Sequence, residues 1–421
     1  MNNKKTSFPW ENRNITEQLA KSYALIKAKG HFVFTQIFDV KTEQADKNRP
    51  LDNALVSIKD LINVAGYKTK AGSKFLEATD IATQDAVAVQ KLRAAGATLL
   101  GHTNMTELAF SGLGINPHYG TPETPLYKGC IAGGSSSGGA VSVALGIVDI
   151  ALGTDTGGSL RIPAAFCGVT GFKPSQNSVS REGCLPLSFS LDSIGPIAHN
   201  VSECEYVWQI LSDVKTSSSV AKQAKLVVPT NFGFDDLDIE VKNAFQAMKL
   251  QLMQTEGITI EEKHLSFLDD YKTLPIWHFA AFEAKHYYEE RFHFQWEQLD
   301  PRVASRLKRA DHLQDSDFKA TKVKQEALIH RYAEEENNDI LLLPTVAILP
   351  PRLSTIESND DYDRINNLCL RNTSLANVLD GCSISIPYQH QGNHIGVMLI
   401  AANGDDTKLL SIAKKLELSF K

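Results

Sequence analysis

The chain has 421 residues, of which 43 are Lys or Arg and 49 are Asp or Glu, so its formal net charge is −6 at pH 7. Hydrophobic residues make up 43% and charged residues 22% of the sequence, an ordinary balance for a globular protein that excludes intrinsic disorder as its main state. The acidic balance and the lack of a Lys/Arg-rich run argue against a nucleic-acid-binding protein.

No segment is expected to cross a membrane. The longest apolar stretch, residues 141–152, contains Asp149 and is shorter than the roughly 20 apolar residues that a spanning helix needs. The basic N-terminal residues are not followed by an apolar core, so no signal peptide is predicted. The six cysteines are spread along the chain without a C-x-x-C pair, and we therefore expect free thiols and a cytoplasmic location.

Hydrophobic patterning in the first hundred residues predicts alternating helices and strands. A helix is expected over residues 15–47, followed by a buried strand over residues 54–58. A second helix is predicted over residues 83–95, ending at Gly96, and a second strand over residues 97–101. This alternation indicates an α/β sheet protein.

The middle and end of the chain follow a different pattern. A small-residue helix over 140–146 and a strand over 148–152 lie between two glycine-rich segments. The more polar residues 213–336 are interpreted as peripheral helical cover, with helices over 238–255, 278–299 and 318–337. Strands are then predicted over 340–344, 383–386 and 395–400, the last two joined by a turn at 391–393.

The first glycine-rich segment is GGSSSGG at residues 133–139. A flexible linker is one interpretation, but apolar segments expected to be structured lie on both sides. A phosphate-binding loop would need a lysine after its last glycine, where this chain has Ala140. A dinucleotide-binding motif is also excluded, because no G-x-G-x-x-G follows a strand.

The second segment is GTDTGGS at residues 153–159. Consecutive glycines allow backbone N–H groups to approach a ligand oxygen closely and to point the same way. A serine directly after them, here Ser159, can act as a nucleophile beside its own oxyanion hole. The alternative interpretation is a tight turn without catalytic function.

Lys59 stands at the end of the predicted strand over 54–58. Burial of a lysine lowers its pKa and makes the neutral amine available as a base. The alternative is a lysine that is simply paired with a carboxylate. The joint occurrence of this lysine with both glycine-rich segments favours the catalytic interpretation.

Together these segments resemble the amidase signature family. The resemblance rests on residues 133–137, 153–159, 161–168 and 171–174, with further family-like residues at 58–60, 101–107, 191–196 and 339–345. It is strong over about residues 50 to 210 and weak in the C-terminal part. It implies an α/β fold with a single large mixed β-sheet covered by helices on both faces. One amidase domain over residues 1–421 is expected, with a core at about 50–210, a helical periphery at about 213–336 and C-terminal strands at about 338–421.

The resemblance also implies roles for individual residues. Ser159 matches the family's nucleophile, Lys59 its general base, and Ser135 the bridging serine, which in the family follows a cis peptide bond, here Gly134–Ser135. Ser135 and Ala109 are expected to contact the substrate, Ala109 as a residue of the acyl pocket.

The family's oxyanion hole corresponds to the backbone amides of four consecutive residues in this chain: Thr156, Gly157, Gly158 and Ser159. Thr154, Asp155 and Arg161 are expected to support the site without direct participation. No cofactor or metal is implied, and His390 and His394 flank a predicted turn instead of sharing a helix face, which argues against metal ligation.

The implied function is an amidase that hydrolyses a carboxylic or ureido-type amide through an acyl-enzyme and releases ammonia or an amine. The shortness of the chain favours a small-molecule amide substrate. One alternative is the amidase (A) subunit of a tRNA-dependent amidotransferase, although the length and residues 371–381 fit a free-standing enzyme better. Another is a catalytically silent binding protein, against which the intact Lys59, Ser135 and Ser159 argue. Homodimers are common in the family, so a homodimer is also an expectation.

Overall fold

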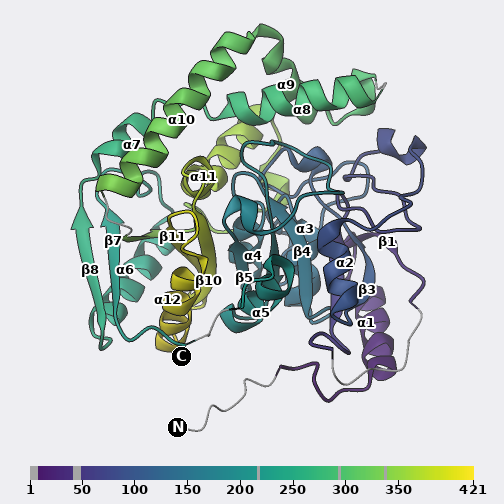
Figure 1. Cartoon of the computed structure of the whole chain (residues 1–421), viewed down its shortest axis with the longest axis horizontal. Coiled ribbons are helices and arrows are strands. Elements are labelled where there is room, and N and C mark those ends of the chain that lie inside the picture. The colour runs from purple at the N-terminus through teal and green to yellow at the C-terminus, as the bar shows by residue number, and fades with distance from the viewer. Residues whose placement is uncertain (1–7, 41–48, 216–218, 293–294, 336–338) are drawn as a thin grey trace.

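The structure, a computed structural model, describes residues 8–40, 49–215, 219–292, 295–335 and 339–421. Within these residues, eleven strands form one mixed sheet, shown in Figure 1. In sheet order the strands are β1 (Phe34–Ile37), β3 (Thr98–Thr103), β2 (Leu55–Lys59), β4 (Ile150–Asp155), β6 (Ser193–Ala198), β5 (Thr170–Lys173), β10 (Cys382–His390), β11 (Asn393–Ala401), β9 (Ile340–Pro344), β7 (Ala224–Pro229) and β8 (Ile258–Lys263). The predicted single mixed sheet is confirmed.

Helices cover both faces of this sheet. Successive residues of a strand point to opposite faces. In β5, Phe172 contacts Trp208 at a ring-centroid distance of 6.0 Å, whereas a Cβ on the neighbouring Gly171 would lie 2.8 Å from Cβ of Ala164. Trp208 and Ala164 belong to helices α5 and α4, which therefore lie on opposite faces.

The helices, in chain order, are α1 (Ile15–Lys29), α2 (Val87–Ala94), α3 (Ser137–Ala144), α4 (Arg161–Cys167), α5 (Val201–Ser212), α6 (Ile239–Met253), α7 (Ser266–Tyr271), α8 (Trp277–Arg291), α9 (Pro301–Lys308), α10 (Asp315–Glu335), α11 (Asn359–Val378) and α12 (Asp406–Ser419). Figure 1 shows α8, α9 and α10 together at the top of the view, above the sheet. In the described part of the chain, no helix combines the length and the apolar character needed to cross a membrane.

The first predicted helix is wrong in extent. Helix α1 ends at Lys29, and strand β1 follows at Phe34, where a continuing helix was expected. Gly30 caps the helix, since its backbone N–H donates to the carbonyl of Ile26. Strand β1 then pairs antiparallel with β3, so tertiary pairing overrides the local helical pattern. The remaining part of the prediction, residues 41–48, lies outside the described residues.

The interpretation of residues 213–336 as helical cover is also incomplete. The predicted helix over 238–255 is confirmed as α6, but β7 and β8 extend the sheet within the same region. Strand β7 is almost wholly buried between β9 and β8, and it runs parallel to both. The helix predicted over 278–299 ends at Arg291. The predicted strand over 340–344 and the hairpin at 391–393 are confirmed.

Strands β2 and β4 place polar side chains at one edge of the sheet. Both are buried along their whole length, and they run parallel to one another. Their carboxyl ends therefore meet at the same edge of the sheet. Lys59 is the last residue of β2 and Asp155 the last of β4, so polar side chains from separate parts of the sequence come together there.

Candidate active site

Lys59 lies at the centre of a buried polar cluster. Its side chain is fully buried, with a relative exposure of 0%. Nζ lies 2.7 Å from Oγ of Ser135 and 2.9 Å from Oγ1 of Thr154. The two contacts aim the amine at the first serine of the glycine-rich segment 133–139.

Burial decides the charge of this lysine. Desolvation lowers the pKa of Lys59 from its ordinary 10.5 to about 7, although Asp155 and Asp192 pull it the other way. Among the described residues, no carboxylate lies within ion-pair distance of Lys59, so the structure does not support the alternative of a lysine paired with a carboxylate. A large share of the side chain is therefore a neutral amine at neutral pH.

The segment that carries Ser135 is tied to the segment that carries Ser159. The Gly134–Ser135 peptide bond is cis, as the family resemblance implied, and helix α3 begins two residues later at Ser137, earlier than predicted. The backbone N–H of Ser136 donates to the carbonyl oxygen of Ser159 at 3.2 Å. Both Ser135 and Ser159 are buried, with exposures of 0% and 3%.

The turn after β4 presents backbone amides to the site. The N–H groups of Thr156, Gly157 and Ser159 donate to no group among the described residues, and the three residues line a cavity. The amide of Gly158 instead donates to Oδ1 of Asp155 at 2.8 Å. Gly158 therefore differs from the sequence expectation, because its N–H is occupied inside the turn and is not free for a substrate oxygen.

A buried ion pair holds this turn. Nε and Nη2 of Arg161 donate to the two carboxylate oxygens of Asp155 at 3.0 and 2.8 Å. Burial raises the pKa of Asp155, but the charge and hydrogen bonds of Arg161 outweigh it and bring the pKa to about 2. Asp155 therefore stays ionised. Thr154 contacts Lys59, and Asp155 and Arg161 contact one another; their role as supports of the site stays a prediction.

Two residues of the segments noted in the sequence, Asn377 in 371–381 and Asp192 in 191–196, were given no role there, yet both contact the catalytic turn. Asn377 of α11 accepts from Nη2 of Arg161 at 2.7 Å and donates to the backbone of Asp155 at 3.0 Å. Asp192 accepts from Oγ1 of Thr156 at 2.5 Å, and burial raises the pKa of its carboxyl to about 6. Both residues are polar positions within apolar surroundings, which is the signal that could have found them.

The cavity in front of Ser159 has a volume of about 1150 Å³. Ala109, which the resemblance assigns to the acyl pocket, lies in its wall and is buried, with a positive φ of 60°. Ser135 does not belong to the wall and lies next to Lys59 instead. Side chains of α7, α8, α9 and α11 also line the cavity.

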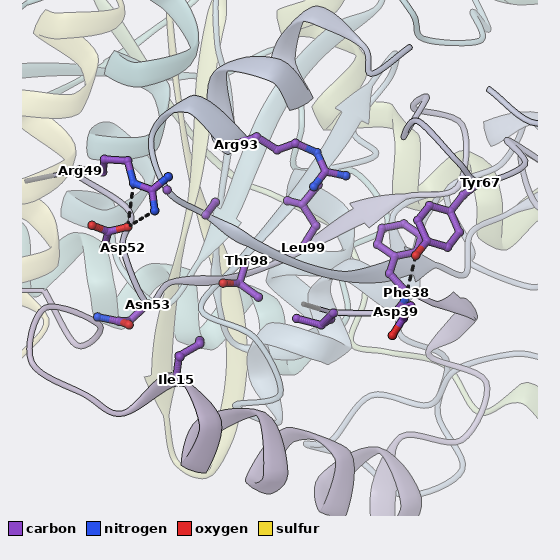
Figure 2. A pocket seen from close by; sticks show the side chains of 13 residues that line it. Ile15, Phe38, Asp39, Arg49, Asp52, Asn53, Tyr67, Arg93, Thr98 and Leu99 are labelled. Atoms are coloured by element: carbon purple, nitrogen blue, oxygen red, sulfur yellow. Dashed lines mark hydrogen bonds and ion pairs between the residues drawn. The ribbon is translucent and has the colours of Figure 1, made fainter. Parts of the chain in front are cut away.

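A second cavity, of about 370 Å³, lies elsewhere (Figure 2). Thr98 in its wall begins β3, at the sheet edge opposite the one where Lys59 ends the parallel strand β2. As Figure 2 shows, Arg49 binds Asp52 there, and the hydroxyl of Tyr67 accepts from the backbone of Asp39. This cavity is remote from the two serines.

The described residues contain no group of three or more His, Cys, Asp or Glu side chains that could hold a metal ion. His390 ends β10 and His394 lies in β11, on either side of the hairpin turn. The six cysteines are all free thiols.

Comparison with known proteins identifies the family of this chain. The family model described as Amidase matches residues 15–410. The chain belongs to the amidase family. It is accordingly an amide hydrolase that acts on carbon–nitrogen bonds other than peptide bonds.

Three relatives of this amidase illustrate the range of the family. The indoleacetamide hydrolase of Pseudomonas savastanoi is 33% identical over 396 residues, which cover 90% of this chain and 86% of the relative. The A subunit of the glutamyl-tRNA(Gln) amidotransferase of Methanococcus maripaludis is 29% identical over 430 residues, which cover 96% and 98%. A crystal structure of an amidase matches with a TM-score of 0.84 and 30% identity, covering 97% of both chains.

Proposed function

We propose that Lys59, Ser135 and Ser159 form a catalytic triad that hydrolyses a carboxylic or ureido-type amide and releases ammonia or an amine. The observation that carries this proposal is the 2.7 Å contact between Nζ of Lys59 and Oγ of Ser135. A lysine whose pKa lies at about 7 can accept a proton at neutral pH, which an ordinary lysine cannot do.

The proton path follows from the order of the groups. Neutral Lys59 accepts the proton of Ser135, Ser135 accepts the proton of Ser159, and Oγ of Ser159 attacks the amide carbonyl. The amides of Thr156, Gly157 and Ser159 stabilise the resulting oxyanion, and loss of one such donor costs about 3 kcal/mol. The proton returns through Ser135 to the leaving nitrogen, and water then hydrolyses the ester on Ser159. In this scheme Ser135 relays the proton between Lys59 and Ser159. It is not among the residues that line the substrate cavity.

A serine-directed label tests the nucleophile. A fluorophosphonate probe should form one covalent adduct, at Ser159, detected by mass spectrometry of the digested protein. Ser159→Ala should lose both the adduct and the turnover of amides. Ser137→Ala provides a matched control, since Ser137 is a buried serine of the neighbouring segment whose hydroxyl donates to a backbone carbonyl, 3.4 Å away. Full labelling and turnover in Ser159→Ala would overturn the assignment, and an unreactive wild-type chain would favour the silent binding protein.

We further propose that the chain is one amidase domain that works in the cytoplasm on a small-molecule substrate. The single sheet, with strands from residue 34 to residue 401, supports one domain. Six free thiols suit a reducing compartment. The homodimer remains a prediction, which the molar mass in solution would test.

A second candidate function is that of the amidase component of an amidotransferase. The 29% identity to such a component over 98% of its length favours it. Such a chain would bind a partner protein and hydrolyse glutamine for ammonia transfer. Affinity purification of the tagged chain from its own cells would decide: a stoichiometric second protein would favour the amidotransferase, and a chain that purifies alone and is active on simple amides would favour the free-standing amidase.

A further inference from the structure

One wall of the cavity in front of Ser159 is apolar. The loop over residues 187–192 contributes Leu187 and Leu191, and the start of α8 contributes Trp277, Ala280 and Ala281. Trp277 is 41% exposed, although tryptophan is usually covered. A large exposed aromatic side chain in a cavity wall is typical of a surface that buries an apolar part of a ligand.

The charged groups of the cavity come from other elements, and its cations are already bound. Five cations line the cavity, and each contacts an acceptor of the protein: Lys272 binds Asp269, Arg306 and Arg309 bind Asp363, Arg364 binds Asp361, and Arg371 binds the carbonyl oxygens of Gly233 and Asp235. The side chains of Asp235, Asp236 and Asp238 also line the cavity. Four of these five cations are already paired with a carboxylate of the protein, and four acidic residues, Asp235, Asp236, Asp238 and Asp363, line the cavity, so a carboxylate on the substrate would meet both repulsion and competition for the cations.

A single carboxylate joins the two elements of the apolar wall. Glu283 of α8 accepts from the hydroxyl of Ser188, from the backbone N–H of Ser190 at 3.1 Å and from the hydroxyl of Ser190 at 2.7 Å. Glu283 lies on the same helix as Trp277, and the two serines lie between Leu187 and Leu191. These three hydrogen bonds fix the helix against the loop.

The same loop is tied to the catalytic turn. Asp192 accepts from the backbone N–H groups of Leu187 and Ser188 at 2.9 and 3.0 Å, and its other oxygen accepts from Oγ1 of Thr156. The apolar wall is thus held at a defined position relative to the turn that carries Ser159.

We propose that this wall, which we name the α8 wall and define by Leu187, Leu191, Trp277, Ala280 and Ala281, binds a neutral, bulky apolar acyl group of the amide substrate, and that Glu283 positions it. The proposal rests on the proposed acyl transfer to Ser159, because it assigns the acyl group to this side of the cavity. The cavity, at about 1150 Å³, exceeds the usual range of about 300–1,000 Å³ for small-molecule sites, so it accommodates a group larger than a short aliphatic chain. Glu283 is a positioning residue, since it contacts the wall and not the reacting atoms.

The experiment compares three primary amides by ammonia release. Butyramide is the reference, phenylacetamide carries a larger apolar group, and succinamic acid replaces the terminal methyl group of butyramide by a carboxylate. Burial of the phenyl ring should raise kcat/KM for phenylacetamide about tenfold or more above that for butyramide. The kcat/KM for succinamic acid should fall below that for butyramide. Equal values for butyramide and phenylacetamide, or a preference for succinamic acid, would overturn the substrate class.

Variants then test the wall and its positioning residue. Trp277→Ala should remove most of the preference for phenylacetamide over butyramide, measured as the ratio of the two kcat/KM values. Glu283→Gln should raise KM for phenylacetamide while kcat stays unchanged, since the wall contributes binding that is equal in the ground and transition states. Glu289→Gln is the matched control, because Glu289 is an exposed residue of the same helix whose carboxylate lies 3.8 Å from Lys285.

The outcomes separate this proposal from the proposed function. If Trp277→Ala keeps the full preference, the α8 wall is not the acyl site. If Glu283→Gln lowers kcat for both amides equally, Glu283 does not act through the wall. Either result leaves Ser159 as nucleophile, provided that the fluorophosphonate adduct at Ser159 is retained. Turnover of butyramide by Ser159→Ala, in contrast, would reject the proposed function itself.

Discussion

The pH dependence of the rate should follow the neutral fraction of Lys59. Burial lowers the pKa of Lys59 from 10.5 to about 7. At pH 7 about half of such a lysine is neutral, whereas only about 0.03% of an ordinary lysine would be. Between pH 6 and pH 8 the neutral fraction rises from about 9% to about 91%, so kcat/KM should rise about tenfold and then level off.

The assay is ammonia release at a substrate concentration well below KM, from pH 5.5 to pH 9.5. Three other buried groups titrate in this range, because burial raises the pKa of Asp60 and of Glu203 to about 7 and that of Asp192 to about 6. The temperature dependence of the pH midpoint distinguishes these carboxyl groups from Lys59. An amine ionises with a large enthalpy and a carboxyl with almost none, so the midpoint should move to lower pH on warming only if the lysine is responsible.

Lys59→Met provides the critical variant, since methionine is a long, unbranched side chain without the amine. The rate should fall by at least about a thousandfold, and the residual rate should lose the rise between pH 6 and pH 8. A wild-type midpoint near pH 10, or the same rise in Lys59→Met, would refute the assignment of Lys59 as the base.

The same variant should be more stable than the wild type. The folded-state pKa of Lys59 lies below the unfolded value, so between about pH 7 and pH 10.5 the unfolded chain binds the extra proton. The contribution of Lys59 to the free energy of unfolding therefore increases as the pH rises from about 7 to about 10.5. Lys59 destabilises the folded protein most at about pH 7 and below. Lys59→Met should remove this dependence and raise Tm at pH 7, as measured by calorimetry, and an unchanged Tm at both ends of the window would contradict the shift.

Further predictions concern the intermediate and its supports. Hydroxylamine should divert product to hydroxamate, and a primary amide and its anilide should give the same acid-to-hydroxamate ratio, because both pass through one acyl-enzyme on Ser159; clearly different ratios would exclude that intermediate. Arg161→Ala should lower the free energy of unfolding by about 3–5 kcal/mol in urea titrations, because it leaves the carboxylate of Asp155 buried and unpaired; a loss below about 1 kcal/mol would contradict this. Gly158→Ala should abolish turnover, since φ is +135° and the new Cβ would lie 2.2 Å from Oγ1 of Thr373; wild-type kcat would show that the turn tolerates the change.

The sequence alone predicted the elements that are marked by a local pattern of residues. The buried strand before Lys59, the hairpin at residues 391–393 and the helix α6 follow from apolar runs, turn residues and helical periodicity, and the structure contains all three. The family resemblance over residues 50 to 210 predicted the single mixed sheet, which is confirmed, and named Lys59, Ser135 and Ser159. Those three residues do converge on one edge of the sheet, while their chemical roles stay a prediction.

Local pattern failed where distant partners decide the structure. Residues 34–37 continue a helical pattern, yet they form a strand because β3, more than sixty residues away, supplies the hydrogen-bonding partner. Strand β7 was not predicted, because it lies within a polar region of the sequence. Its apolar residues form a strand because they pair with β9 on one side and β8 on the other. Parallel pairing of this kind joins segments that are far apart in the chain, which no local window of sequence can show.

The properties of the site likewise depend partly on the sequence and partly on the tertiary structure. The sequence by itself determined which reactive groups are present: a lysine at a strand end, two serines and a run of glycines. Only the tertiary structure decided their state. Burial at the edge shared by β2 and β4 lowers the pKa of Lys59, and Asp155 takes the N–H of Gly158 away from the predicted oxyanion hole. The α8 wall likewise depends on tertiary contacts: Glu283 binds serines of a loop about ninety residues earlier in the chain, because desolvation and hydrogen bonding depend on neighbours in space and not in sequence.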